Sequence, residues 1–135
     1  APHGPLPTTA HPASRPVIEA PAVPSATVSR MPPHTTLIDT SCLASLLGGA
    51  PGVLVVDCRF DLRVPEWGEA QYRERHVAGA VYAHLDHDLS GRKTGTNGRH
   101  PLPSPDALAD TFSRLGIGDG MQVVAYDQGN GMYAS

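Results

Sequence analysis

One short run, Val53-Leu-Val-Val56, places the tightest limit on how this chain of 135 residues can fold. The run is continuously apolar, mostly β-branched, and ends at Asp57. A strand with one face in water alternates apolar and polar residues, whereas a strand covered on both faces does not. The run therefore predicts a strand within a parallel sheet that carries helices on its faces.

A second apolar run, Met121 to Tyr126, is followed by the glycine-rich segment Asp127-Gln-Gly-Asn-Gly131. This order is typical of a buried strand that ends in a loop. In parallel α/β folds, the loops at the carboxyl ends of strands are where ligands bind and where backbone N–H groups converge. We therefore expect the position of a ligand-binding or catalytic site near Asp127.

The first helix is predicted over residues 41–47. Asp39 or Thr40 supplies an N-cap, and the glycines at positions 48 and 49 end the helix. A brief strand over residues 36–38 precedes it, and the helix presents one apolar face formed by Leu43, Leu46 and Leu47.

A second helix is predicted after the proline-rich segment 101–106. Ser104 is a natural N-cap, Pro105 suits the first helical position, and Gly116 ends the run. Apolar residues recur at three- and four-residue spacing, which indicates a face directed to the core. The members of that face are Leu108, Ala109, Phe112 and Leu115.

The remaining segments complete an alternating order of strands and helices. Residues 60–75 are polar and predict an irregular arm, residues 80–82 predict a third strand, and residues 86–98 predict an exposed polar loop. Alternation of this kind favours an α/β fold with a mostly parallel sheet.

Composition excludes several classes of protein. The net charge is -3 and the basic residues are scattered, which argues against binding to nucleic acid. No apolar run approaches the roughly 20 residues that span a bilayer. Two cysteines make neither a disulfide framework nor a four-ligand metal site, so we expect a reducing compartment, the cytoplasm.

Residues 1–34 differ in composition from the rest of the chain. They hold nine of the 14 prolines and only three charged residues, Arg15, Glu19 and Arg30. Such a segment has too few large apolar side chains to offset its ordering entropy. We therefore predict a disordered leader over residues 1–34 and one domain over residues 35–135.

Four motifs in this order resemble the rhodanese sulfurtransferase family over residues 36–135. They are Val53-Leu-Val-Val-Asp-Cys-Arg59, Tyr72-Arg-Glu-Arg-His-Val-Ala-Gly-Ala-Val81, Gly98-Arg-His-Pro-Leu-Pro-Ser-Pro105, and Leu115-Gly-Ile-Gly leading into Val123-Val-Ala-Tyr-Asp127. The arm Asp86-His-Asp-Leu-Ser-Gly91 resembles the amino-terminal domain of two-domain thiosulfate or 3-mercaptopyruvate sulfurtransferases more than a single-domain rhodanese.

The resemblance implies a three-layer α/β fold with a mostly parallel sheet. It also implies that the sequence is truncated before the family's last strand, which inserts between the first and the fourth. We therefore expect a domain that is incomplete at its carboxyl end, with two unpaired strand edges and either poor solubility or a loose fold.

The resemblance also implies a chemistry. In the family, a cysteine after the fourth strand takes sulfane sulfur from a small-molecule donor, holds it as a persulfide and passes it to a thiophilic acceptor such as cyanide or a thiol. Asp127 stands at that position here, and a carboxylate cannot carry sulfane sulfur. We expect no catalytic residue in this chain, no cofactor, and a carboxyl-terminal rhodanese domain as the missing partner.

Four further residues are expected to support the site without taking part in chemistry: Asp57, Arg59, His76 and Arg99. The first two are expected to tie a strand end to neighbouring backbone and to an acidic partner such as Glu74. Cys42 and Cys58 are expected to be structural, although a helix start could lower the pKa of Cys42.

The residues offer the donors or glycines of two other types of site. The segment His84-Leu-Asp-His-Asp88, with His76 and His100 elsewhere, has enough donors for a metal site, but the family resemblance accounts for this arm without metal. The glycines at positions 129 and 131 lack the lysine of a phosphate-binding P-loop. The expectation is therefore no metal and no phosphate.

Two functions of different class remain open. The chain is either the non-catalytic amino-terminal domain of an active sulfurtransferase, or a catalytically inactive rhodanese-like module that binds partners. A second rhodanese pattern with a cysteine at the position equivalent to Asp127 would favour the enzyme.

Overall fold

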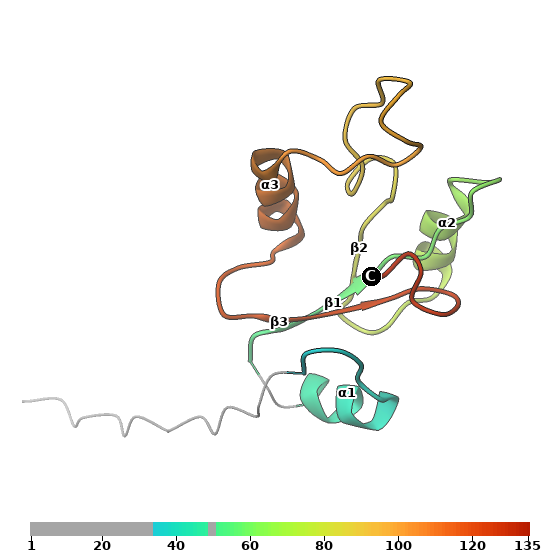
Figure 1. Ribbon diagram of the computed structural model, residues 1–135. Helices are drawn as coiled ribbons and strands as arrows, with labels where there is room; N and C mark the ends of the chain where they lie inside the picture. The colour runs from blue at the N-terminus through green and yellow to red at the C-terminus, as the bar shows by residue number, and fades with distance from the viewer. Residues whose placement is uncertain (1–33, 49–50) are drawn as a thin grey trace, which may run out of the picture. The chain divides into compact units, whose positions relative to one another are not determined.

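The computed structural model describes residues 34–48 and 51–135, in which helices and strands alternate (Figure 1). The elements are α1 (Thr40–Leu47), β1 (Val53–Asp57), α2 (Trp67–Glu74), β2 (Val81–Tyr82), α3 (Pro105–Leu115) and β3 (Gln122–Tyr126). Of the predicted leader over residues 1–34, only His34 lies within the described residues, and Gly49 lies outside them.

β1 is the central strand of a three-stranded sheet in the order β2-β1-β3, and both neighbours run parallel to it. Val55 is opposite Val124, and Val56 is opposite Val81. Val55 and Val56 are both buried although their side chains point to opposite faces. The prediction of a parallel sheet around a strand covered on both faces is confirmed.

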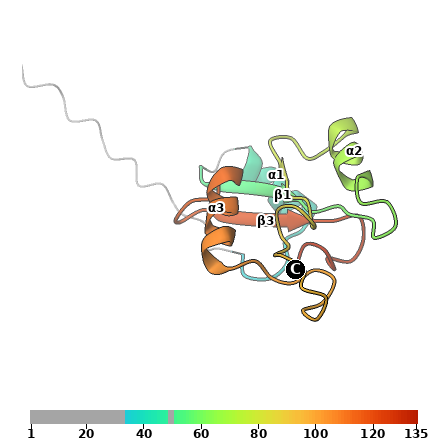
Figure 2. The same ribbon diagram turned by 90° about the horizontal axis from the view of Figure 1, so that it is seen from above.

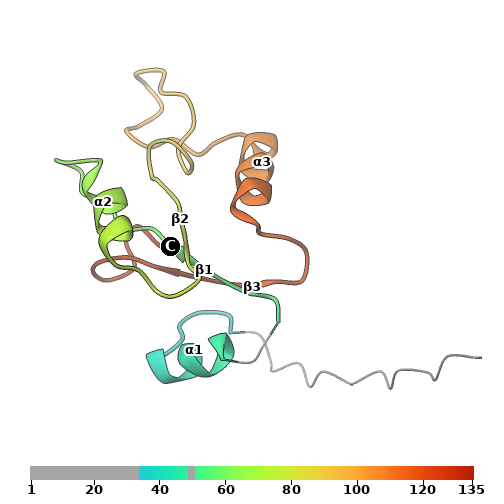
Figure 3. The same cartoon turned by 180° about the vertical axis from the view of Figure 1, so that it is seen from behind.

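The helices cover both faces of this sheet. α1 lies on one face and α2 and α3 lie on the other, as the front and rear views show (Figures 1 and 3). From above, α3 lies toward the amino ends of β1 and β3 and α2 toward their carboxyl ends (Figure 2). A buried cluster of Val56, Cys58 and Ala83 packs against partly buried residues that include Leu54 and Leu115. The α/β fold with three layers is confirmed.

The N-caps predicted for α1 and α3 are both confirmed. Asp39 Oδ1 accepts a hydrogen bond from the Cys42 N–H at 2.8 Å, so α1 begins at Thr40. Ser104 Oγ accepts from the Ala107 N–H at 3.3 Å at the start of α3. Gly116 ends α3 with a φ of 85°, a left-handed conformation that glycine adopts without a steric penalty.

The prediction of an irregular arm over residues 60–75 is wrong for Trp67–Glu74, which form the helix α2. Only a narrow side of this helix packs: Gly68 is buried, and a Cβ there would lie 1.8 Å from the carbonyl oxygen of Arg59. The opposite side carries an exposed pair, Arg73 Nη2 to Glu69 Oε1. Because the buried stripe is built on a glycine, the sequence shows no apolar periodicity there.

The predicted apolar face of α3 is also shifted. Thr111 is the buried residue, whereas Ala109 and Phe112 are exposed. Arg114 Nη2 donates to Asp88 Oδ1 at 3.0 Å and approaches Thr111 Oγ1 at 3.4 Å. The helix therefore faces the segment that follows β2 with Arg114 and Thr111, while Leu115 packs against the buried apolar cluster.

The predicted strand over residues 36–38 does not form, and Leu37 is 91% exposed. A side chain replaces the expected ladder: the His34 N–H donates to Gln122 Oε1 at 3.0 Å, and Gln122 Nε2 donates to the His34 carbonyl at 3.3 Å. A groove of about 380 Å³ lies between residues 34–38 and β3. Within the described residues, the strands that form are hydrogen-bonded neighbours in the order β2-β1-β3, and the groove lies along the outer edge of β3.

β3 is an edge strand and not the buried strand that its apolar run predicts, because Val123 and Ala125 are exposed. The loop prediction for residues 86–98 is right in form, but its first part, residues 86–91, is mostly half-buried. Within the described residues, no helix is long and apolar enough to cross a membrane.

Candidate functional site

The carboxyl ends of β1 and β3 lie side by side because the two strands are parallel, with Asp57 opposite Tyr126. The segments that leave them begin with Cys58 and Asp127. Ligands of open α/β sheets bind at this edge. The structure therefore brings three of the predicted residues, Asp57, Arg59 and Asp127, to one edge of the sheet.

The carboxylate of Asp127 is held by the backbone of the loop that it begins. Oδ1 accepts from the N–H groups of Gly129 at 2.8 Å and Gly131 at 3.1 Å, and Oδ2 accepts from Tyr133 at 2.8 Å. Partial burial raises the pKa of Asp127, but these N–H donors outweigh it and leave the pKa below its ordinary value.

The backbone N–H groups of this loop converge as they do in an anion-binding site, which we call the Asp127 cradle. The anion that they bind is a side chain of the same molecule. Converging backbone N–H groups favour a negative charge at their centre. Here the charge is the Asp127 carboxylate, which occupies three of the donors. A carboxylate has no sulfur to exchange, so the loop as it stands supports no thiol chemistry.

Asp57 forms the polar centre beneath that loop. It is fully buried, and Arg59 contacts it with Nε at 3.0 Å to both oxygens and with Nη2 at 2.6 Å to Oδ2. The Tyr126 hydroxyl also donates to Oδ2. The hydrogen bond to Asp57 raises the pKa of Arg59, and burial followed by that same carboxylate raises the pKa of Tyr126.

The predicted partner of Arg59 is wrong in one respect. Its Nη2 donates to the backbone carbonyl of Arg75 at 2.7 Å, and its ion pair is with Asp57 and not with Glu74. Arg59 therefore joins the end of β1 to the residue after α2. The predicted tie to neighbouring backbone is present.

The cysteines are not activated thiols. Burial, then the negative charges of Asp57 and Asp127, raises the pKa of Cys58 to about 12. The Asp39 side chain raises the pKa of Cys42, which reverses the lowering that a helix start alone would produce. Neither environment resembles that of a nucleophilic thiolate.

The other two predicted supporting residues have backbone partners. The His76 ring stacks on Tyr72 at 4.1 Å between centroids, and its Nδ1 lies 2.7 Å from the Tyr72 carbonyl oxygen. Arg99 Nη2 donates to the Leu62 carbonyl at 2.8 Å. His76 holds its own turn and Arg99 joins two segments that are 37 positions apart, and neither of these hydrogen bonds involves the Asp127 carboxylate.

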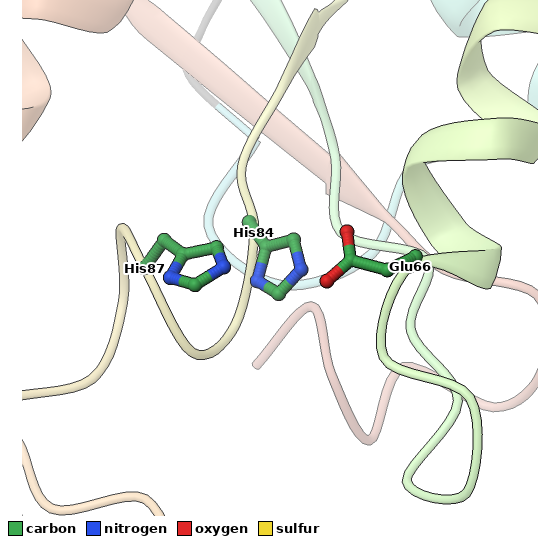
Figure 4. Close-up of side chains that lie close together, drawn as sticks. All are labelled: Glu66, His84 and His87. Atoms are coloured by element: carbon green, nitrogen blue, oxygen red, sulfur yellow. The ribbon is translucent and has the colours of Figure 1, made fainter.

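The histidines divide into separate environments. His84 and His87 lie together with Glu66 at the start of α2, with all three ligand atoms within 4.8 Å of one another (Figure 4). His100 Nε2 instead lies 3.3 Å from Asp86 Oδ1, and His76 lies against Tyr72. The sequence indicated the pair of histidines but not Glu66, which is eighteen positions earlier.

Sequence reasoning also missed Gln128. Its side chain accepts from the Phe60 N–H at 3.2 Å and donates to the Phe60 carbonyl at 2.7 Å, so it joins the loops after β1 and β3. An amide side chain inside a glycine-rich loop carries no sequence signal for such a distant contact. Only the adjacency of two strand ends could have suggested it.

Comparison with known proteins finds no family model that matches the chain. Curated relatives are found. The "Probable 3-mercaptopyruvate sulfurtransferase" of Pseudomonas aeruginosa is 45% identical over 86 residues, 63% of this chain and 30% of its own length. SseB of Mycobacterium tuberculosis, named as a candidate thiosulfate sulfurtransferase, is 38% identical over 94 residues, 70% of this chain and 33% of its own.

A solved structure agrees with these sequences. The 3-mercaptopyruvate sulfurtransferase from Leishmania major has a TM-score of 0.55 and 30% identity, over 62% of this chain and 23% of its own. The chain spans about a third of the length of the curated relatives that it matches. Matching sequence, a parallel sheet with helices on both faces and a superimposable structure agree. The chain contains a domain of the rhodanese-like sulfurtransferase family.

Proposed function

We propose that this chain is the non-catalytic amino-terminal rhodanese domain of a sulfurtransferase. The whole enzyme moves sulfane sulfur from thiosulfate or 3-mercaptopyruvate to a thiophilic acceptor, cyanide or a thiol, through a cysteine persulfide. The names of the relatives support this reaction class. Their partial coverage is compatible with one domain of a two-domain protein.

One observation carries the non-catalytic role. The position where the family places its sulfur-carrying cysteine holds Asp127, and its carboxylate takes three backbone N–H groups of the loop. The described thiols offer no substitute, since Cys58 is buried with a pKa near 12 and the pKa of Cys42 is raised. A thiol is a poor nucleophile until it is ionised.

The role left to this domain is to shape one wall of the cleft in which a second rhodanese domain works. Each charged group at the edge formed by Asp57, Arg59 and Asp127 has a hydrogen-bond partner within the domain. The partner in this proposal is the carboxyl-terminal rhodanese domain. The cytoplasm suits a protein with two unpaired thiols.

The test is sulfur transfer with thiosulfate and with 3-mercaptopyruvate as donors and cyanide as acceptor. This chain alone should be inactive. The full product of its gene should be active, should keep its activity in Asp127→Ala, and should lose it when the cysteine in the glycine-rich loop of a second rhodanese pattern is replaced by alanine. A full product without transfer would reject the enzyme and favour an inactive rhodanese-like binding module.

A further inference from the structure

Three side chains from two separate segments converge beside α2. Glu66 immediately precedes the helix, and His84 and His87 follow β2. Figure 4 shows the His84 ring between the His87 ring and the Glu66 carboxylate. Their ligand atoms lie within 4.8 Å of one another, and the two imidazole centroids are 4.2 Å apart. This arrangement was not predictable from the spacing of the histidines alone.

His84 carries the strongest indication of a missing ligand. The residue is only 4% exposed, and its Nε2 is buried without a hydrogen-bond partner. Figure 4 shows one ring nitrogen of His84 directed toward the Glu66 carboxylate. Buried polar atoms are almost always paired, so an exception needs an explanation, and a bound ion is one that the neighbouring Glu66 and His87 make specific here.

The other two groups have unused ligand atoms as well. Glu66 makes no side-chain bond to cap α2, and across the described residues its carboxylate has no ion pair. His87 is exposed and lies near the His84 ring, and its side chain makes no hydrogen bond or ion pair with the other described residues. Glu66 is therefore the carboxylate left free for a ligand.

Nearby acidic groups are already occupied. Asp86 Oδ1 contacts Lys93 at 3.0 Å and His100 at 3.3 Å. Asp88 binds Arg114 with one oxygen and the His84 N–H with the other. These partners neutralise the acidic charge around the cluster and leave one carboxylate facing two imidazoles.

We propose that Glu66, His84 and His87 form a binding site for a zinc-type divalent cation. Two imidazole nitrogens and one carboxylate are a donor set that Zn²⁺ takes, with a fourth position left to water or another ligand. The exposed Glu66 and His87 move inward to the buried Nε2 of His84, which stays fixed. The ion joins the start of α2 to the segment after β2.

Binding requires a change of tautomer at His84. The Asp86 N–H donates to Nδ1 at 3.1 Å, so the ring hydrogen is on Nε2 in the metal-free protein. The metal uses the Nε2 lone pair, and the hydrogen moves through solvent to Nδ1. Because Nδ1 and the Asp86 nitrogen would then both carry a hydrogen, the Asp86 N–H, which lies in the turn of residues 85–88, has to turn away from the ring.

Zinc titration of the whole chain against a chromophoric chelator tests the site. Because the chain has seven histidines, stoichiometry alone does not locate the ion. His87→Ala and Glu66→Gln, both exposed and tolerable to the fold, should each weaken binding by at least about tenfold. The matched controls His76→Ala and Glu74→Gln should bind as the parent chain does.

The imidazole resonances of His84 give an independent measurement. On Zn²⁺ addition, nitrogen NMR should show the ring hydrogen moving from Nε2 to Nδ1. Unchanged affinity in His87→Ala and Glu66→Gln, equal losses in the controls, or an unchanged His84 tautomer would each overturn the proposal. None of these results bears on sulfur transfer, which is assayed without added metal.

Discussion

The Gln128 side chain pairs with both backbone groups of Phe60, accepting from its N–H at 3.2 Å and donating to its carbonyl at 2.7 Å. The contact spans 68 positions and connects the loops that leave β1 and β3. Phe60 is itself 1% exposed and makes edge-on contacts with His84 and Tyr133. One amide therefore links the Asp127 loop to the interior of the domain.

Replacement of that amide should destabilise the domain. Gln128→Ala leaves the partly buried N–H and carbonyl of Phe60 without partners, and we expect a loss of about 1–3 kcal/mol in the free energy of unfolding. Urea denaturation followed by tryptophan fluorescence measures it. Asn130→Ala, two residues along the same exposed loop, serves as the control and should change stability little. Equal effects of the two variants would show that Gln128 has no special role.

The buried carboxylate of Asp57 should matter more. The Asp57 carboxylate pairs with Arg59 and accepts a hydrogen bond from Tyr126. Asp57→Asn removes its negative charge and leaves the Arg59 guanidinium close to the interior without a counter-charge. Breaking a buried pair on one side destabilises by about 3–5 kcal/mol. Tyr126→Phe removes one neutral donor to this carboxylate and should have a smaller effect of about 1.5–3 kcal/mol. If the two variants unfold at the same urea concentration, the ion pair is not the dominant interaction.

The acid dependence of stability should reveal the Asp127 cradle. The pKa of Asp127 in the folded chain lies below its unfolded value, so its stabilisation is complete above about pH 4 and is lost as the pH falls further. The difference in unfolding free energy between the parent and Asp127→Asn should therefore be constant near neutrality and shrink in acid. Because other carboxylates titrate in both proteins, they cancel in this difference. A difference that grows toward low pH would contradict the assignment.

Thiol reactivity should separate the two cysteines. Cys58 is buried with a pKa of about 12, so it should resist iodoacetamide at pH 8 in the folded chain and react once urea unfolds it. Cys42 is half-exposed and should be modified first. Mass spectrometry of the digested protein locates the label. Rapid modification of folded Cys58 would mean that the domain opens readily around its core.

A thiol placed in the cradle should behave differently from both. Asp127→Cys puts sulfur where the N–H groups of Gly129, Gly131 and Tyr133 converge, and such donors favour the thiolate. We expect the pKa of the new thiol to lie below about 8.5, the ordinary value for cysteine. Absorbance at 240 nm as a function of pH measures it, with the parent chain as the blank. A pKa at or above that value would show that the cradle depends on the carboxylate for its shape.

Much of the architecture could be predicted because its signals are local. The β-branched run at Val53 and the Ser104-Pro105 cap each determine an element through contacts within a few residues. α2 escaped prediction because its buried contact is a glycine against the Arg59 carbonyl, which has no hydrophobic signature. The burial of Thr111 was not predictable either, because α3 contacts a segment far away in the sequence, as the pair Arg114–Asp88 shows.

In the site, too, residues with local sequence signals could be predicted and residues positioned by distant contacts could not. Asp57, Arg59 and Asp127 could be expected at one edge because they end or follow parallel strands. The place of Glu66 beside His84 could not be predicted, since it depends on how α2 packs beside β2. Gln128 and Gln122 could not either, because each amide pairs with backbone far away in sequence.

The amide of Gln122 has a further consequence for how these molecules behave toward one another. In the parallel ladder with β1, Gln122, Val124 and Tyr126 direct their backbone groups inward, so Val123 and Ala125 direct theirs outward. Gln122 Nε2 already donates to the Val123 carbonyl at 3.2 Å while its amide holds His34. A strand from another molecule could therefore add only a short ladder at Ala125 before it met this side chain. Gln122 thus occupies part of the open edge of β3, and an occupied edge offers less backbone for edge-to-edge pairing.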